Sequence, residues 1–307
     1  MVVVFGTVCL DRVRRVPSLP DPGGYVEILE ETLLLGGEAA NTARHLASWG
    51  VPVGLAGNNL GAGEEGRRLL ELLRLAGLPT EHLRADAGET PVCDVYVTPD
   101  GDRTMFGKGF SAMDWAAQAE SFPVVPGAWF TAEPNMADAS RLAARRAAEA
   151  GMRTYLMDFV REDEPLQPGG FWQTSTDWAG ARDDADGNRR VAEGIARRYR
   201  CHAILTDGPN GFCWCPPEGP ARLLPTYRCP EVVDSTGAGD AFRAGVLFGL
   251  HQGWPVGRAL AMGAAAVCLA CTRWGASQSI PTLEELRNLQ ESQTETTDAI
   301  LSACAAG

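Results

Sequence analysis

A glycine-rich segment framed by two aspartates, Asp234-Ser235-Thr236-Gly237-Ala238-Gly239-Asp240, carries the residue types that phosphoryl chemistry needs. It follows the strand-like residues 231–233 and leads into an apolar stretch with helical spacing. Glycines at a helix start let backbone N–H groups converge on an anion, and the helix dipole adds about half a positive charge there. The carboxylate of Asp240, on the first turn, can take a proton from a hydroxyl that attacks a phosphoryl group. The segment therefore predicts an anion hole at residues 237–239 with Asp240 as general base.

A second pair of glycines, Gly36-Gly37, stands before a stretch with helical spacing at residues 39–49. Two glycines at a helix entry allow a ligand to approach the backbone closely. Asn41 lies one turn into that helix, where its amide can bond a hydroxyl of a polyol. Farther along the chain, Thr206 and Gly208 follow an apolar strand-like run, a position that suits contact with a phosphate or a nucleotide.

The composition excludes several other classes of function. With a net charge of −12, the chain is a poor electrostatic match for nucleic acid or an anionic membrane. Lys108 is the only lysine, and its neighbours do not form the G-x-x-x-x-G-K-[ST] motif, which excludes a P-loop protein. The four histidines are dispersed without metal-ligand spacing, and no serine nucleophile motif is present. We therefore expect a small-molecule substrate, with neither nucleic acid nor a membrane as partner.

The nine cysteines follow no disulfide framework, which favours a reducing compartment. Cys268 and Cys271 are spaced as small buried residues on a helix. The apolar residues 1–10 lack the basic start and the cleavage site of a secretory signal and are better explained as a buried first strand. No apolar run approaches the roughly 18 residues that span a bilayer. We expect a cytoplasmic protein.

The elements that position these residues alternate between strand and helix. Apolar runs predict strands at 2–8, 51–57, 129–132, 154–159, 203–206 and 211–215. Helical spacing and glycine ends predict helices at 39–49, 64–76, 139–150, 190–199, 238–251 and 255–271, with a further helix and a polar tail after Pro281. Such alternation predicts an α/β fold with a mostly parallel sheet and helices on both of its faces. We expect one domain over residues 1–307.

Two segments, 11–35 and 91–109, break this rhythm because both are extended without an intervening helix. The second contains Pro99-Asp100-Gly101, which is a hairpin signal. We predict that the two segments pair as a small separate sheet that covers the site as a lid and excludes water from it. The exposed face of such a sheet is a candidate contact for a homodimer.

Taken together, these residues resemble the PfkB or ribokinase-like carbohydrate kinases. The resemblance runs nearly the full length of the chain. It includes Phe5-Gly6-Thr7-Val8-Cys9-Leu10-Asp11, the Gly36-Gly37 pair with Asn41, the segment from Asp234 to Asp240, and residues 270–281. It implies the ribokinase-like three-layer α/β/α fold with a mostly parallel central sheet and a small β-sheet lid. It also implies transfer of the γ-phosphoryl group of ATP to a sugar hydroxyl.

The resemblance implies a role for each matched position. Asp240 would be the catalytic base, and the N–H groups of Gly237, Ala238 and Gly239 would form the anion hole. The sugar would be held by Asp11, Gly36, Gly37, Asn41 and Glu133. The nucleotide would be bound by Thr206, Gly208, Gly237 and Gly239, with Mg²⁺ as a cofactor. A monovalent cation such as K⁺ would be held by Asp234, Thr236, Ala270, Arg273, Gly275 and Ser279.

The chain departs from the family pattern in the middle. Members usually carry an N-x-x-E motif that helps to hold Mg²⁺, whereas residues 177–184 here contain neither Asn nor Glu. Asp183 or Asp184 are the candidates to substitute for it. Cys9 stands where ribokinases tend to have Asn, so ribose is not assigned as the substrate. Glu38 follows the glycine pair where Lys or Asn is common, which suggests either a changed sugar preference or exclusion of phosphorylated sugars.

Two alternatives to a sugar kinase stay open from the sequence. A nucleoside kinase of the same fold needs an aromatic or apolar pocket for the base, and Phe106 and Phe110 keep that alternative open. A catalytically weak ligand-binding relative is suggested by the missing N-x-x-E motif, whereas the intact Asp240 argues against it.

Overall fold

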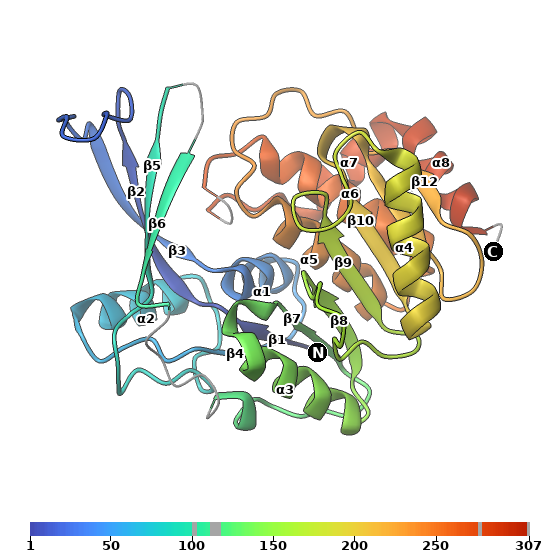
Figure 1. Cartoon of the computed structure of the whole chain (residues 1–307), viewed down its shortest axis with the longest axis horizontal. Coiled ribbons are helices and arrows are strands. Elements are labelled where there is room, and N and C mark those ends of the chain that lie inside the picture. The colour runs from blue at the N-terminus through green and yellow to red at the C-terminus, as the bar shows by residue number, and fades with distance from the viewer. Residues whose placement is uncertain (100–102, 111–117, 276–277, 306–307) are drawn as a thin grey trace.

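The computed structural model describes residues 1–99, 103–110, 118–275 and 278–305, which form two sheets (Figure 1). In these residues the larger sheet has eight strands, in the order β12-β11-β10-β9-β8-β7-β1-β4. Its parallel strands are β1 (Val2–Gly6), β4 (Val53–Gly57), β7 (Trp129–Ala132), β8 (Arg153–Met157), β9 (Phe171–Ser175) and β10 (His202–Thr206). Near one edge of the sheet, β11 (Phe212–Cys215) pairs antiparallel with both β10 and the edge strand β12 (Arg222–Leu224). The predicted mostly parallel sheet is confirmed.

Side chains of the central strand β1 alternate between two hydrophobic cores, as the two-residue period of a strand requires. Val2 and Val4 pack into one core, and Val3 and Phe5 into the other. The first core takes residues from α1 (Glu38–Ser48), α2 (Glu64–Leu75), α5 (Ala238–His251), α6 (Val256–Cys271), α7 (Leu283–Ser292) and α8 (Thr294–Ala305). The second takes residues from α3 (Ala137–Glu149), α4 (Ala185–Tyr199) and the short helices η1 (Gln118–Glu120) and η2 (Pro134–Met136). The sheet is therefore the middle of three layers.

The smaller sheet projects from one end of this body (Figure 1). Its order is β3-β2-β5-β6, with β2 (Cys9–Arg15), β3 (Glu30–Gly36), β5 (Val92–Val97) and β6 (Arg103–Lys108). The predicted pairing of the two extended segments is confirmed, since β2 and β3 both pair within it and β2 lies beside β5. Lys108, at the end of β6, forms an ion pair with Glu89, with Nζ 2.6 Å from Oε1. Asp100 and Gly101 of the predicted hairpin lie outside the described residues.

The predicted first strand, 2–8, is wrong at its end, because β1 stops at Gly6 and Cys9 already belongs to β2. Side chains rather than strand partners satisfy the backbone between them. Thr7 N donates to the Glu133 carboxylate, and Val8 N donates to Asn58 Oδ1 at 2.7 Å. These bonds fix the junction at which the chain passes from the large sheet into the small one.

Other elements were not predicted. Strand β9 lies within residues 161–188, where a five-residue run with Gln and Thr gave no periodic signal. Strand β12 has only three residues. The segment predicted to be a polar tail is the helix α8, which buries Ile300 against the first core. All nine cysteines are free, and every helix in the described residues is too short or too polar to cross a membrane.

Candidate active site

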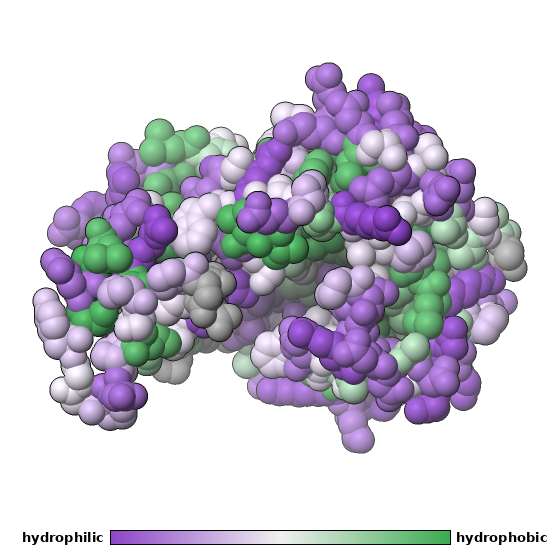
Figure 2. All heavy atoms as spheres, turned by 90° about the horizontal axis from the view of Figure 1, so that it is seen from above, coloured by the Kyte–Doolittle hydropathy of each residue, from purple (hydrophilic) through white to green (hydrophobic). Residues whose placement is uncertain are grey.

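The carboxyl ends of β8, β9 and β10 and the start of α5 enclose an open cavity of about 580 Å³. Parallel sheets place ligand sites at this edge, where the strands end. Figure 2 shows the surface hollowed between the small sheet and the larger body. Predicted site residues Thr206, Gly208, Gly237, Ala238, Gly239 and Asp240 line this cavity. Two separate segments singled out from the sequence therefore meet at this cavity.

The glycine-rich segment forms the start of α5. Gly237 caps the helix with φ at 71°, in the left-handed region that favours glycine. Gln173 on β9 donates from Nε2 to the carbonyl oxygen of Gly239 at 3.1 Å and so ties the segment to the sheet. Residues 237–239 border the cavity, and Ala238 N donates to the Ser235 carbonyl oxygen at 3.2 Å. The N-terminus of α5, with its dipole, can bind an anion there.

Asp240 is buried on that first turn and is held by two side chains. Asn41 donates from Nδ2 to Oδ2 at 3.0 Å, and Arg243 donates from Nη2 to Oδ1 at 2.9 Å. Burial raises the pKa of Asp240 to about 8, and the neighbouring Arg243 opposes that rise. The predicted Asn41 and Asp240 thus come together from positions 199 residues apart.

Arg243 is itself completely buried and was not singled out from the sequence. Besides Asp240, it donates from Nε to Thr42 Oγ1 and from Nη2 to the Glu38 carbonyl oxygen, both at 2.9 Å. Its Nη1 has no partner among the described residues. The i, i+3 spacing from Asp240 places both side chains on one face of α5, which was a signal present in the sequence.

Two further carboxylates lie close to this pair. Glu133 is buried, and its Oε2 accepts from Asn135 N at 2.7 Å. Burial raises the pKa of Glu133 to about 7, and the charge of Glu38 adds to that rise. Glu38 Oε1 accepts from Asn135 Nδ2 at 2.9 Å, while Oε2 is buried without a partner among the described residues. The site is therefore rich in negative charge.

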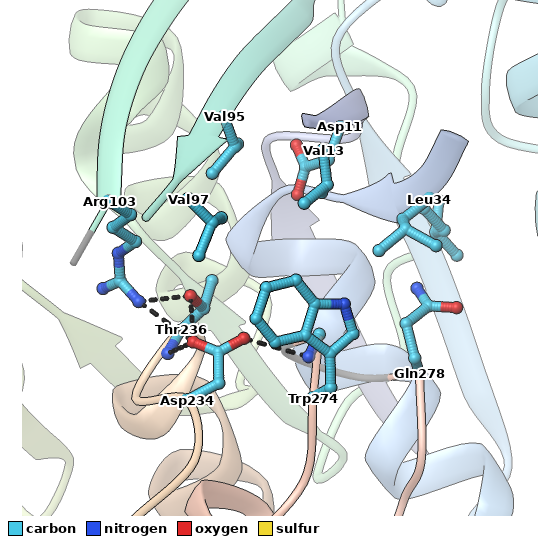
Figure 3. Close-up of a pocket in the computed structure, with 12 residues that line it drawn as sticks. Asp11, Val13, Leu34, Val95, Val97, Arg103, Asp234, Thr236, Trp274 and Gln278 are labelled. Carbon is cyan, nitrogen blue, oxygen red and sulfur yellow. Dashed lines mark hydrogen bonds and ion pairs between the residues drawn. The ribbon is translucent and has the colours of Figure 1, made fainter. Parts of the chain in front are cut away.

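Asp11, on β2, lies where the small sheet meets the body. Its carboxyl packs against Gly36, where an added Cβ would lie 2.1 Å from Asp11 Cγ, so the close approach needs glycine. Cys9 Sγ donates to Asp11 Oδ1 at 3.2 Å, and burial raises the pKa of Asp11 to about 6. Asp11 lines a narrow second pocket of about 30 Å³, whose walls are Val13, Leu34, Leu35, Val95, Val97, Arg103, Asp234, Thr236, Trp274, Gly275 and Gln278 (Figure 3).

The residues expected to hold a monovalent cation come together only in part. Asp234 Oδ1 accepts from Thr236 N at 2.8 Å and from Thr236 Oγ1 at 2.6 Å, and Oδ2 accepts from Gly275 N at 2.9 Å. The carbonyl oxygen of Ala270 accepts from Arg273 N at 3.1 Å. The Arg273 side chain turns away to Glu285 and to the Ser279 carbonyl oxygen.

Asp183 and Asp184 are both engaged away from the cavity lining. Asp184 caps α4 by accepting from Gly187 N at 2.9 Å, and Asp183 accepts from Asn210 Nδ2 at 2.7 Å. The carboxylates that do line the cavity, besides Glu38 and Asp240, are Asp158 and Asp177. Neither Asp183 nor Asp184, the candidates to substitute for the missing motif, lines this cavity.

Asp158 follows β8 directly, with φ at 61°, an uncommon conformation for a residue other than glycine. Thr174 Oγ1 donates to its Oδ1 at 2.6 Å. Burial raises the pKa of Asp158 to about 6. A carboxylate placed at the carboxyl end of a predicted strand was the signal that could have found it.

The chain was compared with known proteins. The model of the pfkB family carbohydrate kinase matches residues 1–140 and 176–283. An uncharacterized sugar kinase of Dictyostelium discoideum is 26% identical over 340 residues, covering 92% of this chain and 95% of the relative. A 5-dehydro-2-deoxygluconokinase of Shouchella clausii is 23% identical, with 95% and 96% covered. Arabidopsis thaliana ribokinase, solved with ribose and ATP, superimposes with a TM-score of 0.78 at 18% identity, with 94% and 97% covered. The ribokinase-like architecture predicted from the sequence is confirmed.

Proposed function

Because the chain belongs to the pfkB family of carbohydrate kinases, we propose that its cavity binds ATP and transfers the γ-phosphoryl group to a hydroxyl of a small sugar. Family members are phosphotransferases that act on sugar hydroxyls. The observation that carries the finer assignment is the position of Asp240. Its buried carboxylate lies on the first turn of α5, beside the N–H groups of residues 237–239 and hydrogen-bonded to Asn41.

In the proposed reaction, Asp240 accepts the proton of the attacking hydroxyl. The hydroxyl oxygen bonds to the γ-phosphorus, and the bond from that phosphorus to the bridging oxygen of ADP breaks. The backbone N–H groups at Gly237, Ala238 and Gly239 and the helix dipole stabilise the negative charge on the transferred group. Since these donors belong to the backbone, the net charge of −12 does not prevent phosphate binding.

We assign Asp11, Asn41, Glu133 and the backbone at Gly36 and Gly37 to the sugar hydroxyls, and Thr206 and Gly208 to the nucleotide. Mg²⁺ prefers oxygen ligands and usually takes one or two carboxylates together with substrate phosphates and water. Asp158 and Asp177, both on the cavity wall, fit that donor set and would hold the ion. When bound, Mg²⁺ neutralises charge on the phosphate oxygens.

The nucleoside-kinase alternative gains no support from the aromatic residues that kept it open. Phe106 packs edge-on against Tyr96, is 58% exposed and lines neither of the two pockets described above. Phe110 lies against Gly107, where an added Cβ would be 3.1 Å from its ring. We therefore favour a sugar as the acceptor.

An ATP-consumption assay over a panel of sugars and nucleosides, with Mg²⁺ present, tests the assignment. We expect ADP formation that depends on one or a few sugars, and phosphosugar detectable by mass spectrometry. Turnover with nucleosides only would favour the alternative kinase. Binding of a sugar without any ADP formation would favour a catalytically weak relative and would contradict the proposal.

The charge of the site predicts which sugars are accepted. Four carboxyls, those of Glu38, Glu133, Asp158 and Asp240, gather around a single buried arginine, and the raised pKa values of the last three make their negative charge grow between about pH 6 and 8. Neutral and amine-bearing sugars should therefore be preferred over sugar phosphates and sugar acids, most clearly at pH 8 and above. Replacing Glu38 with Gln keeps the shape and removes one negative charge. We expect kcat/KM for an anionic sugar to rise about tenfold relative to that for a neutral sugar, since one partly screened like charge is gone.

The matched control is Glu30→Gln, on the small sheet, where the carboxylate pairs with Arg15 and is largely exposed. This variant should leave the ratio between anionic and neutral sugars unchanged. A wild-type enzyme that prefers 5-dehydro-2-deoxygluconate, the acid acted on by the Shouchella clausii relative, over neutral sugars would contradict the charge argument.

The pH dependence follows from the raised pKa of Asp240. Below about pH 8 the buried carboxyl of the free enzyme is largely protonated and cannot accept the hydroxyl proton. We therefore expect kcat/KM for a neutral sugar to increase with pH from 6 and to level off above about 8. The profile is measured with ATP and Mg²⁺ at saturation. A flat profile across this range would show that Asp240 is already ionised at pH 6.

Two further predictions concern the oligomeric state and the cellular location of the protein. Phe106 of the edge strand β6 is an exposed apolar side chain, whereas its neighbour Met105 lines the open cavity. Exposure of Phe106 supports pairing of two copies through that face of the small sheet. Light scattering of the purified protein measures that pairing. The cytoplasmic location, expected from the cysteines, stays a prediction.

A further inference from the structure

Arg103, the first residue of β6, reaches from the small sheet to the loop that precedes the anion hole. Its Nη1 lies 3.2 Å from Asp234 Oδ1 and also contacts Thr236 Oγ1 (Figure 3). Arg103 lines both the narrow pocket beside Asp11 and the open cavity beside Asp240. The guanidinium therefore lies at the boundary between the narrow pocket beside Asp11, a residue assigned to the sugar, and the open cavity proposed to bind ATP.

The Asp234 carboxylate is fully engaged around this contact. Oδ1 accepts from the backbone and hydroxyl of Thr236 as well as from Arg103, and Oδ2 accepts from Gly275 N. Asp234 N and Val233 N in turn donate to the Cys271 carbonyl oxygen, at 3.1 and 2.8 Å. Thr236 directly precedes Gly237, so these bonds fix the backbone from which the anion hole is built.

A monovalent cation does not fit this arrangement. The cation predicted from the family resemblance would use the same Asp234 carboxylate and the same Thr236, where the guanidinium already supplies a positive charge. A second cation at that carboxylate would be repelled by the first, and one carboxylate balances only one of them. The residues therefore disagree with the expected K⁺ site.

We propose that Arg103 replaces the monovalent cation, so that this kinase works without K⁺ and its phosphate site is completed by a residue of the small sheet. The proposal rests on the proposed function of the cavity. Arg103 acts as a positioning residue: it holds Asp234 and Thr236, and through them the N–H groups at residues 237–239. The acceptor side of the site and the phosphate side are thereby joined by one ion pair.

The test compares wild type with Arg103→Met and Arg103→Lys in KCl and in tetramethylammonium chloride of equal concentration. We expect the wild-type kcat/KM for ATP to agree within twofold in the two salts. Arg103→Met should lose at least tenfold in tetramethylammonium and regain part of that loss in KCl, because K⁺ can then reach Asp234. Arg103→Lys should keep most of the wild-type activity, since it keeps the charge. More than fivefold stimulation of wild type by K⁺ would overturn the proposal, as would an unchanged Arg103→Met enzyme.

A second readout needs no turnover and separates this proposal from the proposed function. The melting temperature of the unliganded protein should be the same in the two salts for wild type, and higher in KCl for Arg103→Met. The control is Arg15→Met, which removes an exposed ion pair with Glu30 on the same small sheet and should show no preference for K⁺. A wild-type protein stabilised by K⁺ alone would overturn the proposal even if no sugar were phosphorylated. If the wild type shows no turnover but its melting temperature is the same in the two salts, only the proposed function is contradicted.

Discussion

Replacement of Asp240 by asparagine is expected to lower kcat by about 10²–10⁴-fold, the usual range for loss of a general base. The amide has nearly the shape of the carboxyl, but it cannot accept the proton of the attacking hydroxyl. The variant leaves the buried Arg243 without its partner charge and should be less stable than wild type. It should still fold, because Arg243 keeps its acceptors at Thr42 and at the Glu38 carbonyl oxygen. The measurement is steady-state turnover with the preferred sugar, beside a thermal melt of the same preparation.

Binding of ADP provides the control for this variant, because the backbone donors at residues 237–239 are unchanged. The affinity for ADP should therefore stay within a few-fold of wild type. The rise of kcat/KM toward pH 8 should also disappear from the residual activity, since the group that titrates is gone. Near-normal turnover in Asp240→Asn would remove Asp240 from the role of base.

Replacement of Arg243 by methionine is expected to have the largest effect on stability. Above about pH 8, where Asp240 is ionised, removing one partner of the buried ion pair leaves the other charge uncompensated, which costs about 3–5 kcal/mol of unfolding free energy. Because Arg243 lowers the pKa of Asp240, its loss should also move the pH at which activity levels off to a value above that of wild type. Urea unfolding measures the first effect, and the pH profile of kcat/KM measures the second.

A double variant distinguishes the ion pair from simple packing. In Asp240→Asn with Arg243→Met the unpaired carboxylate is absent, so the protein should be more stable than Arg243→Met alone. Arg243→Lys keeps the charge but loses the forked donors, and it should fall between wild type and Arg243→Met. A double variant as unstable as Arg243→Met would mean that lost packing, and not the pair, accounts for the destabilisation.

The parts of the site that could be predicted are those in which a local motif carries the geometry. The segment from Asp234 to Asp240 contains the glycines, the start of the helix and the candidate base within seven residues. Its role could therefore be predicted without knowledge of the fold. The small sheet could be predicted for a different reason. Two extended segments without helices hydrogen-bond their backbone N–H and C=O groups most readily by pairing with each other. Asn41 was found because it follows a glycine pair at a fixed offset.

The contacts that could not be predicted join residues far apart in the chain. Arg103 contacts Asp234, which lies 131 positions away in the sequence, and no local pattern at residue 103 predicts that contact. Asp158 becomes a site residue because β8 ends beside β9. The polar residues of β9 gave no strand pattern, so this neighbour of β8 was not predicted from the sequence. Arg243 was close enough to Asp240 for its spacing to be visible, but whether it faced solvent or the core depended on α1 packing against α5.

Lys108 gives the small sheet a chemical handle that requires no mutagenesis. It is the only lysine of the chain, it ends β6 five residues from Arg103, and its ammonium is exposed beside Glu89. The hydrogen bond to Glu89 raises the pKa of Lys108, whereas burial lowers the pKa of the Met1 amine. Acylation at neutral pH should therefore favour the Met1 amine, whereas Lys108 reacts at alkaline pH. A first acylation at neutral pH blocks the Met1 amine, and alkaline labelling of the blocked protein then places a fluorophore on Lys108, whose emission would report movement of the small sheet during turnover.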